Sequence, residues 1–457
     1  MNLLVKDKCF YEKMAVIAIP ISLQSMITIG VNMTDTVMVG MLGETSLSAT
    51  ALANQFVNIY QICCMGIAMG ASVLTSRFWG MQDITSLKKT ITLMLRLCIV
   101  LAVLFMLPTI LIPQLLMRMY TNDSAVIAQG VQYFKWMVYC YFLQGMTLTC
   151  TIVLRSVGQV NFPLFTSIGS FFVNILFNYM FIFGKLGVPR MEVEGAGVGT
   201  LIARVFEFSL ICGYFLFVDR KIGYRLKDLR MKCNSLIKDY VSISIPVFVS
   251  DSLLALGTSA VAMVMGRIGT GFVSANSITV VTQQLTTVII QGICHASCIM
   301  TGHTLGHGER EKAQQQAWTF LILGLVVGIL GGGLIKVLSR PIIGLYNITP
   351  ETAQIAGELM DAIAFIVIFQ SMNSILTKGV LRGGGDTKFL MVADIIFLWA
   401  ASLPLGILAG LVWHLDAFWI YVFLKIDQIC KSIWCVFRLR SGKWIKAFSK
   451  EKMNHAQ

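Results

Sequence analysis

The sequence predicts an all-α polytopic membrane protein with twelve transmembrane helices, arranged as two repeats of six. Its 457 residues are 56% hydrophobic and only 13% charged, with mean hydropathy +0.75, and such a composition needs lipid as solvent. Apolar stretches of roughly 20 residues, the length of a spanning helix, follow one another along the chain. The first half of the sequence returns in the second half, so both halves are expected to share one fold.

Twelve stretches separated by short polar breaks are long enough to span a bilayer. A transmembrane barrel would instead show strands of about ten residues with alternating polarity. The first six helices are expected at 14–39, 48–76, 90–112, 131–154, 162–184 and 195–217. The second six are expected at 240–265, 272–301, 314–336, 352–380, 389–411 and 417–437. The first stretch is too long for a signal-peptide core, so we expect it to be a retained span.

The repeat has an offset of 226 residues and runs without a gap across about sixty positions. Its matched pairs are Pro20 and Pro246, Gly40 and Gly266, Gly43 and Gly269, Ala49 and Ala275, Gly66 and Gly292, Thr75 and Thr301, and Gly80 and Gly306. A second echo, shifted by one more residue, matches 154–159 (LRSVGQ) with 381–386 (LRGGGD). A repeat of half the chain in apolar residues is typical of internally duplicated membrane transporters.

These boundaries divide the chain into two lobes and two polar segments. We expect an N-terminal six-helix lobe at 1–218, a cytoplasmic linker at 219–239, a C-terminal six-helix lobe at 240–438 and a basic cytoplasmic tail at 439–457. Lysine and arginine gather in alternate loops, with seven of them in 220–238 alone. Because cytoplasmic loops hold the excess of these residues, both termini are expected in the cytoplasm of a plasma-membrane protein.

The net charge of +13 does not indicate a nucleic-acid partner. The basic residues lie in the loops expected to be cytoplasmic, where membrane topology and anionic lipid account for them. Most of the twelve cysteines lie inside the predicted helices and form no CxxC pair, so disulfides and metal ligation are not expected. The partners expected from the sequence are the lipid bilayer and small molecules.

Several segments resemble the multidrug and toxic compound extrusion (MATE) exporters. The resemblance is carried by 32–40 (NMTDTVMVG) followed by Ala49 and Ala53, by 154–159 (LRSVGQ), 174–178 (NILFN), 195–200 (GAGVGT) and 381–386 (LRGGGD). It covers nearly the whole chain, and its strength lies in the order and spacing of the segments. The resemblance implies a V-shaped pair of six-helix lobes that exports organic cations in exchange for inward sodium or protons. We expect a monomer, although the sequence itself carries no signal for the oligomeric state.

Asp35 is the foremost candidate for chemistry within the bilayer. A charge at a helix centre costs at least ~2.5–3.5 kcal/mol unless it is paired or hydrated. Its counterpart in the second repeat is Val261, so the helix itself does not require a carboxylate at this place. A functional role is therefore the simpler explanation, and a structural hydrogen bond to a neighbouring helix is the alternative.

Two further pairs of residues share the helical spacing that would surround Asp35 with oxygen. Asn174 and Asn178 are four apart on the fifth helix, and Ala196 and Thr200 repeat this spacing on the sixth. Carboxylate, amide, hydroxyl and carbonyl oxygens suit a hard cation, whereas interhelical hydrogen bonding is the alternative. In MATE proteins the matching positions form the cation site of the N-terminal lobe, which the resemblance extends to these five residues.

The sequence departs from the MATE pattern at two acidic positions. Some relatives carry a second carboxylate where Asn178 stands, and others carry one in the C-terminal lobe where Asn373 stands. Asp35 would then be the one titrating group of the site. A neutral shell around it suits sodium, and a lone carboxylate with a raised pKa would serve equally as a proton carrier, so both ions stay open.

Other polar residues in the predicted helices are candidates for the substrate cavity. Gln24, Asp251 and Asn373 belong to this group. Asp251 has no partner three or four residues away, so lining the cavity and bonding to a neighbouring helix are equally good interpretations. Asp361 lies near the outer end of its helix and is expected to reach water.

Two pairs of opposite charges have structural interpretations. Arg204 and Glu207 are three apart and Asp427 and Lys431 are four apart, so each pair is expected to neutralise itself. Lys425 has no such partner.

Pro20 and Pro246 occupy equivalent positions in the first and seventh helices. Each removes one backbone N–H and permits a bend. We expect these prolines to act as hinges for rocking between inward-open and outward-open states.

The leading function from the sequence is a secondary active multidrug exporter without cofactor, using Na⁺ or H⁺ as coupling ion. A flippase for lipid-linked precursors, from the wider superfamily that the resemblance points to, is the second hypothesis. The expected twelve helices and the acid at position 35 argue against it. A membrane enzyme is third, because the sequence offers no nucleophile with a base or His cluster with metal spacing. No GxxxxGK[ST] loop supports ATP-driven transport.

Overall fold

The structure is a computed structural model that describes residues 4–344 and 348–446, apart from the side chains of Thr270, Val281 and Leu285. Helices build the fold, and the described residues contain no β-strand. Eleven of the described helices are long and apolar enough to cross a membrane. The predicted basic tail lies outside the described residues from position 447 onward.

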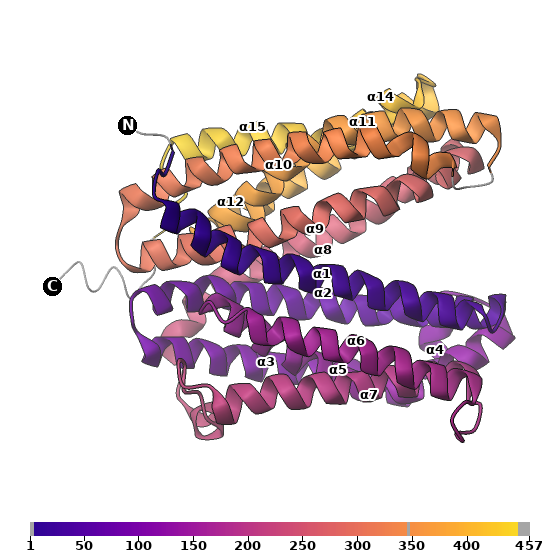
Figure 1. Cartoon of the computed structure of the whole chain (residues 1–457), viewed down its shortest axis with the longest axis horizontal. Helices are drawn as coiled ribbons and strands as arrows, with labels where there is room; N and C mark the ends of the chain where they lie inside the picture. Colours follow the sequence, from indigo (N-terminus) through magenta and orange to yellow (C-terminus); the bar gives the residue numbers. More distant parts are fainter. Residues whose placement is uncertain (1–3, 345–347, 447–457) are drawn as a thin grey trace. The chain divides into compact units, whose positions relative to one another are not determined.

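A helix occupies each of the six stretches predicted for the first half (Figure 1). All six begin before the predicted stretch, by one to seven residues, because they extend into the polar residues that precede it, and their ends lie within four residues of the predicted ones. Their bounds are α1 Lys8–Gly40, α2 Glu44–Gly80, α3 Ile84–Leu111, α5 Ser124–Ser156, α6 Asn161–Phe183, and α7 Glu192–Gly213 with its π-helical end η1 Tyr214–Val218. The short α4 Pro113–Arg118 follows α3, and the 3₁₀ turn η2 Leu226–Arg230 lies in the linker.

The second half repeats this order with more interruptions. It contains α8 Asn234–Ile268, α9 Thr270–Gly306, α10 Arg310–Gly344, and α11 Pro350–Ser374 continued by the π-helical η3 Ile375–Leu381. The eleventh span is α12 Thr387–Asp394, η4 Ile395–Ser402, α13 Leu403–Ile407 and η5 Leu408–Val412, and the last is α14 Ala417–Leu424 with α15 Ile426–Arg440.

The offset of the sequence repeat is also the offset between helix starts. α2 begins at Glu44 and α9 at Thr270, 226 residues later, and both are 37 residues long. The same difference separates the first residues of α1 and α8, of α3 and α10, of α5 and α11, and of α6 and α12. Both α2 and α9 follow a glycine with positive φ, Gly43 at 120° and Gly269 at 158°. The repeat therefore extends from the sequence to the turns that start the helices.

The twelfth predicted span, 417–437, is a broken helix. α14 ends at Leu424, and Lys425 has φ −122° and ψ 17° before α15 begins. The hydroxyl of Ser402 donates to the freed carbonyl of Leu424 at 2.6 Å, which compensates part of the lost helical bonding. Each piece is too short to cross a membrane alone, which explains why eleven intact spans are found in the described chain.

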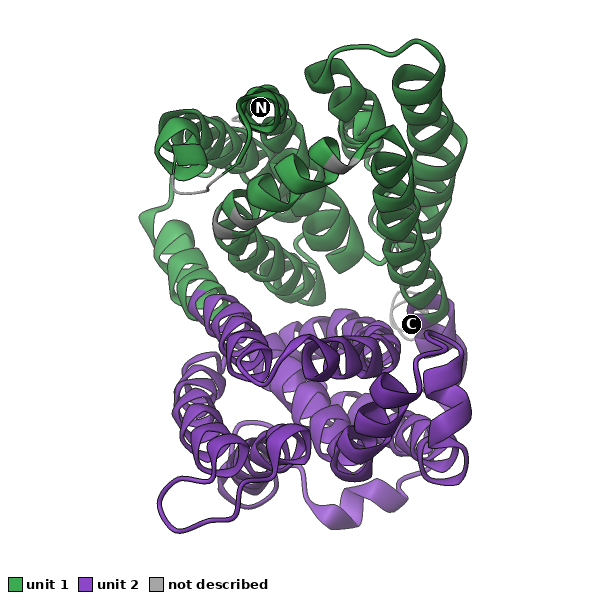
Figure 2. Ribbon diagram, turned by 90° about the vertical axis from the view of Figure 1, so that its right-hand side faces the viewer, with its two compact units in different colours: residues 1–22, 245–457 green, residues 23–244 purple. Residues whose placement is uncertain are grey.

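The chain divides into two compact units whose boundaries fall inside helices (Figure 2). One unit contains residues 1–22 and 245–457, and the other contains residues 23–244. α1 therefore passes from one unit to the other after Ser22, and α8 passes after Ser244. Pro20 and Pro246 each lie two residues from such a boundary, inside an uninterrupted helix.

Small residues let helices approach closely in both units. A Cβ at Gly292 of α9 would lie 2.4 Å from the carbonyl oxygen of Ala18 in the first part of α1. In the other unit, a Cβ at Gly70 of α2 would lie 2.0 Å from Oγ of Ser244, at the end of the first part of α8. Ala18 and Ser244 are 226 residues apart, so equivalent segments pack on equivalent helices.

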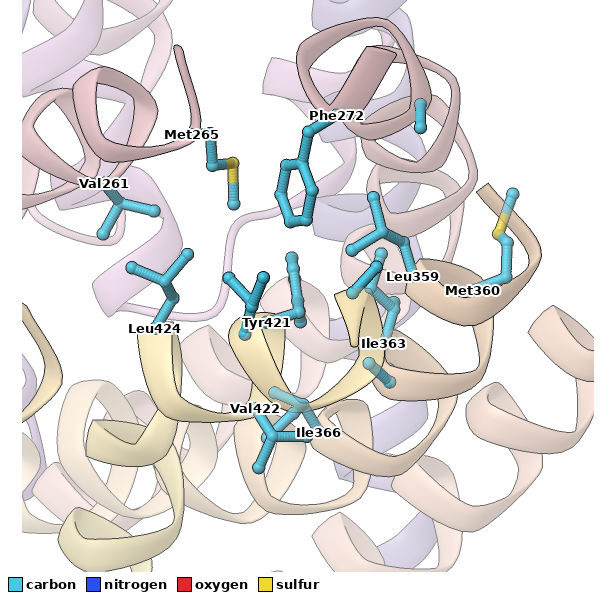
Figure 3. Close-up of a cluster of buried hydrophobic side chains, with 14 of the residues drawn as sticks. Val261, Met265, Phe272, Leu359, Met360, Ile363, Ile366, Tyr421, Val422 and Leu424 are labelled. Atoms are coloured by element: carbon cyan, nitrogen blue, oxygen red, sulfur yellow. The ribbon is translucent and has the colours of Figure 1, made fainter. Parts of the chain in front are cut away.

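Each unit has its own apolar core. In residues 23–244, Tyr60, Phe105 and Tyr141 form a ring cluster, with 5.0 Å between the centroids of Tyr60 and Tyr141. In the other unit, α8, α9, α11 and α14 enclose the cluster drawn in Figure 3, which includes Phe272 and Tyr421. These cores hold the helices that carry the polar residues described below.

The linker between the halves is ordered against α3. Lys88 of α3 donates to the carbonyl of Gly223 at 2.6 Å and pairs with Asp228 at 2.9 Å. Partial burial opposes ionisation of Asp228, but the Lys88 ammonium and the backbone N–H of Arg225 outweigh it and hold the pKa of Asp228 below its ordinary value. The linker is thus attached to the unit formed by residues 23–244.

Candidate functional site

The site begins with the close packing of α6 on α7. Gly195 and Gly199 are four apart on α7 and face α6. A Cβ at Gly195 would lie 2.5 Å from the Phe181 carbonyl, and one at Gly199 would lie 2.1 Å from Oδ1 of Asn178. The two glycines thus allow the polar side chains of α6 to lie directly against the backbone of α7.

Asp35, Asn174 and Asn178 form one hydrogen-bonded group. Nδ2 of Asn178 donates to Oδ1 of Asp35 at 2.6 Å and to Oδ1 of Asn174 at 3.3 Å. The two asparagines are 2% and 1% exposed, whereas Asp35 is half-buried. The spacing of the asparagines on α6 therefore places both amides beside the carboxylate of α1.

Asp35 also faces two cavities within the same unit. The larger, about 330 Å³, is lined by Asp35, Ala196 and Thr200 together with polar side chains of α2 and α5. The smaller, about 60 Å³, is lined by Asp35, Asn174 and Thr200. The structure thus brings all five residues predicted for a cation site into one region of residues 23–244.

One oxygen of this group has no hydrogen-bond donor. Oδ1 of Asn178 is buried and has no partner, although its amide nitrogen makes two bonds. A buried acceptor without a donor is costly, and a hard cation is the kind of ligand that satisfies it. The side-chain oxygens of Asp35, Asn174 and Thr200 are also ligands that suit a hard cation.

The charge pair predicted on α7 is present and belongs to this site. Arg204 and Glu207 are joined by an ion pair of 2.8 Å. Arg204 also lines both cavities, and Glu207 lines the smaller one. The predicted neutralisation of one residue by the other is therefore confirmed, and the pair also places one positive and one negative charge beside Asp35.

Four polar residues of the larger cavity were missed by sequence reasoning. They are Asn54, Asn58 and Gln61 on α2 and Gln144 on α5. A signal was available, because positions 54, 58 and 61 follow the spacing of one helix face within an apolar span. The hydroxyl of Tyr133, another lining residue, donates to Oδ1 of Asn54 at 3.2 Å.

The second repeat has an apolar residue in place of Asp35. The counterpart of Asp35 is Val261, which is 4% exposed in the core cluster of Figure 3. The equivalent place is therefore part of a hydrocarbon core in one half and of a polar site in the other.

Comparison with known proteins agrees with this fold. The family model MatE matches residues 20–180 and 246–429, which is most of the chain. The chain belongs to the MatE family.

This MatE chain has distant relatives over nearly its full length. It is 24% identical over 419 residues to the "Uncharacterized transporter YisQ" of Bacillus subtilis, covering 90% of each chain. It is 24% identical over 436 residues to the "Probable multidrug resistance protein NorM" of Thermotoga maritima, covering 94% of this chain and 92% of that one. A variant of the Vibrio cholerae MATE transporter VcmN superposes with TM-score 0.86 at 16% identity, covering 95% and 97% of the two chains. This likeness establishes the two-lobe fold of twelve helices.

The three predicted cavity residues of the MatE chain are all engaged by other side chains. Gln24 is 8% exposed, donates to Oγ of Ser167 at 2.8 Å and accepts from Arg155. Asp251 forms an ion pair of 3.1 Å with Arg382, so the bond to a neighbouring helix is present. Asn373 is 5% exposed, and its amide donates to Oε1 of Gln428 at 2.7 Å.

The predicted pair on the last span is part of a larger buried cluster. Lys431 lies 3.0 Å from Asp427 and also 3.0 Å from Asp394 of α12, and its side chain is only 2% exposed. Ser250 of α8 donates to Asp394. Asp361, expected to reach water, is about 40% exposed and pairs with Lys336 of α10.

Proposed function

We propose that this MatE protein is a secondary active multidrug exporter that exchanges lipophilic organic cations for inward Na⁺ or H⁺ by alternating access. The proposal places it in the plasma membrane with both termini in the cytoplasm. It rests on the family membership, on the relative named as a multidrug resistance protein, and on the group around Asp35. The decisive observation is a single carboxylate, in an apolar span, facing a polar cavity of about 330 Å³.

The geometry suits one monovalent cation at a time. Asp35 can bind either a proton or Na⁺, and each would reduce the cost of a charge within the bilayer. For Na⁺, the amide of Asn178 would turn about its last side-chain bond and offer its unpaired oxygen. For H⁺, the amide would keep its present place and the carboxyl would take the proton.

Arg204 supports coupling by electrostatic competition. Its guanidinium lines the cavities with Asp35 while it pairs with Glu207 at 2.8 Å. An organic cation entering the larger cavity would be attracted by an ionised Asp35 and would lose this attraction once a proton or Na⁺ had neutralised the carboxylate. Substrate and coupling ion would therefore bind in alternation, as antiport requires.

The test is efflux of a fluorescent lipophilic cation from proteoliposomes under an imposed sodium or proton gradient. Wild-type protein is expected to respond to at least one gradient, and the effective gradient names the coupling ion. Asp35→Asn is expected to abolish the response, because the amide neither binds a proton nor supplies a charge. Asp361→Asn removes a carboxylate from an exposed pair and should keep transport near the wild-type rate.

Two results would contradict the proposal. Unaltered gradient-driven transport by Asp35→Asn would remove the assigned coupling role of this residue. Failure of the wild type to move any cation under either gradient would overturn the exporter function, and assays for flipping of lipid-linked precursors would follow.

A further inference from the structure

We propose that the last two spans of this protein form a binding site for one anionic phospholipid. The site is a groove of about 540 Å³ on the unit formed by residues 1–22 and 245–457. Residues of α12, η4 and α15 line it, and α12 and α15 are labelled in Figure 1. It is separate from the Asp35 site, which belongs to the other unit, and does not depend on the proposed transport function.

One wall of the groove is an apolar stripe along α15. Ile433, Trp434 and Phe437 lie three, four and seven residues beyond Cys430, so the four side chains share one helix face. The three large residues are 51%, 41% and 68% exposed, which leaves a wide apolar surface uncovered. In a bilayer this surface is covered by lipid chains.

Aromatic rings give this stripe a fixed shape. The ring of Phe397 meets Trp434 edge-on with centroids 5.1 Å apart, and Phe389 lies 6.0 Å from Trp434. Such ring pairs contribute stabilisation in addition to that from the apolar area they bury, so the rings hold one another in place. The groove is thus a preformed surface and not only a row of flexible side chains.

The polar end of the groove is positively charged. Arg438 stacks over Phe389 at 4.7 Å and donates to Asp386 at 2.7 Å, and Lys446 lies 3.4 Å from the same carboxylate. Within the described range 348–446, the Asp386 carboxylate therefore faces two bases at this end. Lys443 adds a third positive charge, is exposed, and also lines the groove.

Lys443 is held beside the groove by its neighbour. Trp444 is fully buried, its indole N–H donates to Oε1 of Gln314 at 2.7 Å, and its ring packs on Gly384. The turn after α15 is anchored by this contact, so Lys443 is presented at a defined place.

The apolar and basic parts of the groove follow one another in the same order as the acyl chain and the headgroup of a phospholipid. Along α15 from Cys430 to Arg438, about 12 Å at 1.5 Å per residue, the lining changes from apolar and aromatic to cationic. An acyl chain fits the aromatic part, and the phosphate of the headgroup fits Lys443 with Arg438. The excess of positive charge selects an anionic lipid over a zwitterionic one.

The experiment uses the full-length protein in vesicles and Trp434 as the reporter. Quenching of tryptophan fluorescence is measured with phosphatidylglycerol or phosphatidylcholine carrying brominated acyl chains. Subtracting the signal of Trp434→Phe isolates the contribution of Trp434. At equal mole fraction, the anionic lipid is expected to quench Trp434 more strongly than the zwitterionic lipid.

Lys443→Gln tests the headgroup contact. A lysine near an anionic bilayer surface contributes roughly 1 kcal/mol, so the preference for phosphatidylglycerol should fall about fivefold. Arg440→Gln is the matched control, since Arg440 ends the same helix but does not line the groove, and it should keep the preference. Both variants leave the buried Trp444 and the Asp386 pair untouched.

Three results would overturn the proposal. Equal quenching by the two lipids would show ordinary contact with bilayer chains, and equal losses in both lysine and arginine variants would show a diffuse surface effect. Relief of quenching by inorganic phosphate would show that the site binds a free anion. Relief by unbrominated phosphatidylglycerol, with no effect of phosphate, is the expected outcome.

Discussion

Gly199 provides a sharp test of the Asp35 site at the scale of a single residue. A Cβ at this position would lie 2.1 Å from Oδ1 and 2.8 Å from the backbone nitrogen of Asn178. Gly199→Ala therefore has to push α6 away from α7 or displace the amide from Asp35, at a cost of about 1–3 kcal/mol. Coupled transport in proteoliposomes is expected to fall about tenfold or more, although the protein still folds.

The control for this prediction lies on the same helix. A Cβ at Gly213 would have no heavy atom within 4 Å, so Gly213→Ala adds a methyl group to open space. This substitution is expected to leave transport unchanged and to favour the helix slightly. Equal transport by the two alanine variants would show that the close contact at Asn178 has no functional importance.

Replacing Lys431 is expected to lower the stability of the protein strongly. Its ammonium is buried between Asp394 and Asp427, 3.0 Å from each. Lys431→Met leaves two buried carboxylates without their counter-ion, which is expected to cost about 3–5 kcal/mol of folding free energy. Thermal unfolding of the detergent-solubilised protein measures this loss as a lower midpoint temperature.

The matched substitution at an exposed pair is Lys336→Met. Lys336 pairs with Asp361, but both side chains are largely exposed, at 63% and 42%. Such pairs contribute about 0–1 kcal/mol, so the midpoint should hardly change. A similar fall in midpoint temperature for Lys431→Met and Lys336→Met would mean that burial of the pair does not determine the free energy lost when its lysine is removed.

Sequence spacing predicted the local charge pairs but could not predict the distant ones. Arg204 with Glu207 and Asp427 with Lys431 are three and four residues apart, and helix geometry alone brings them together. Arg382 lies 131 residues from Asp251. Such a contact depends on how separate helices pack, so no local pattern indicates it.

At the scale of the helix, Pro20 is the main candidate for a hinge. It lies inside α1, two residues before the chain passes from one compact unit to the other. Pro20→Ala restores a backbone N–H and with it one helical hydrogen bond, so it should stiffen α1. We expect unchanged folding and slower turnover, measured as the maximal rate of gradient-driven efflux.

Pro108→Ala is the control for this substitution. Pro108 lies inside α3, within a single compact unit, so removing it should not affect a movement between units. Turnover at the wild-type rate in Pro20→Ala would remove the hinge role. A slowed Pro246→Ala would strengthen it, since Pro246 occupies the equivalent place in α8.

The sequence predicted the helices well because each is long and apolar. All twelve stretches coincide with helices, and five pairs of helix starts keep the offset of 226. The break at Lys425 was not predicted, because no proline or glycine marks it. It depends on distant contacts, such as the bond from Ser402 to the carbonyl of Leu424, and on the burial of Lys431.

At the scale of the whole molecule, the two halves share a framework but differ in polarity. Equivalent helix segments pack on equivalent helices, as Ala18 and Ser244 show. The carboxylate at position 35, however, corresponds to the buried Val261. The repeat thus accounts for the shared framework, and the proposed coupling chemistry depends on positions at which the two halves differ.

The proposed orientation in the membrane can be tested with a single thiol. Cys9 lies at the start of α1 and is exposed, whereas the other eleven cysteines are buried or half-buried. A thiol reacts with maleimide as the hydrated thiolate, so cysteines facing lipid or core should react slowly. If the N-terminus is cytoplasmic, a membrane-impermeant maleimide should label intact cells weakly and permeabilised cells strongly. Cys9→Ser should remove the gain on permeabilisation. Labelling of Cys9 that is as strong in intact cells as in permeabilised cells would place the N-terminus outside the cell. The proposed directions of ion entry and drug export would then be reversed.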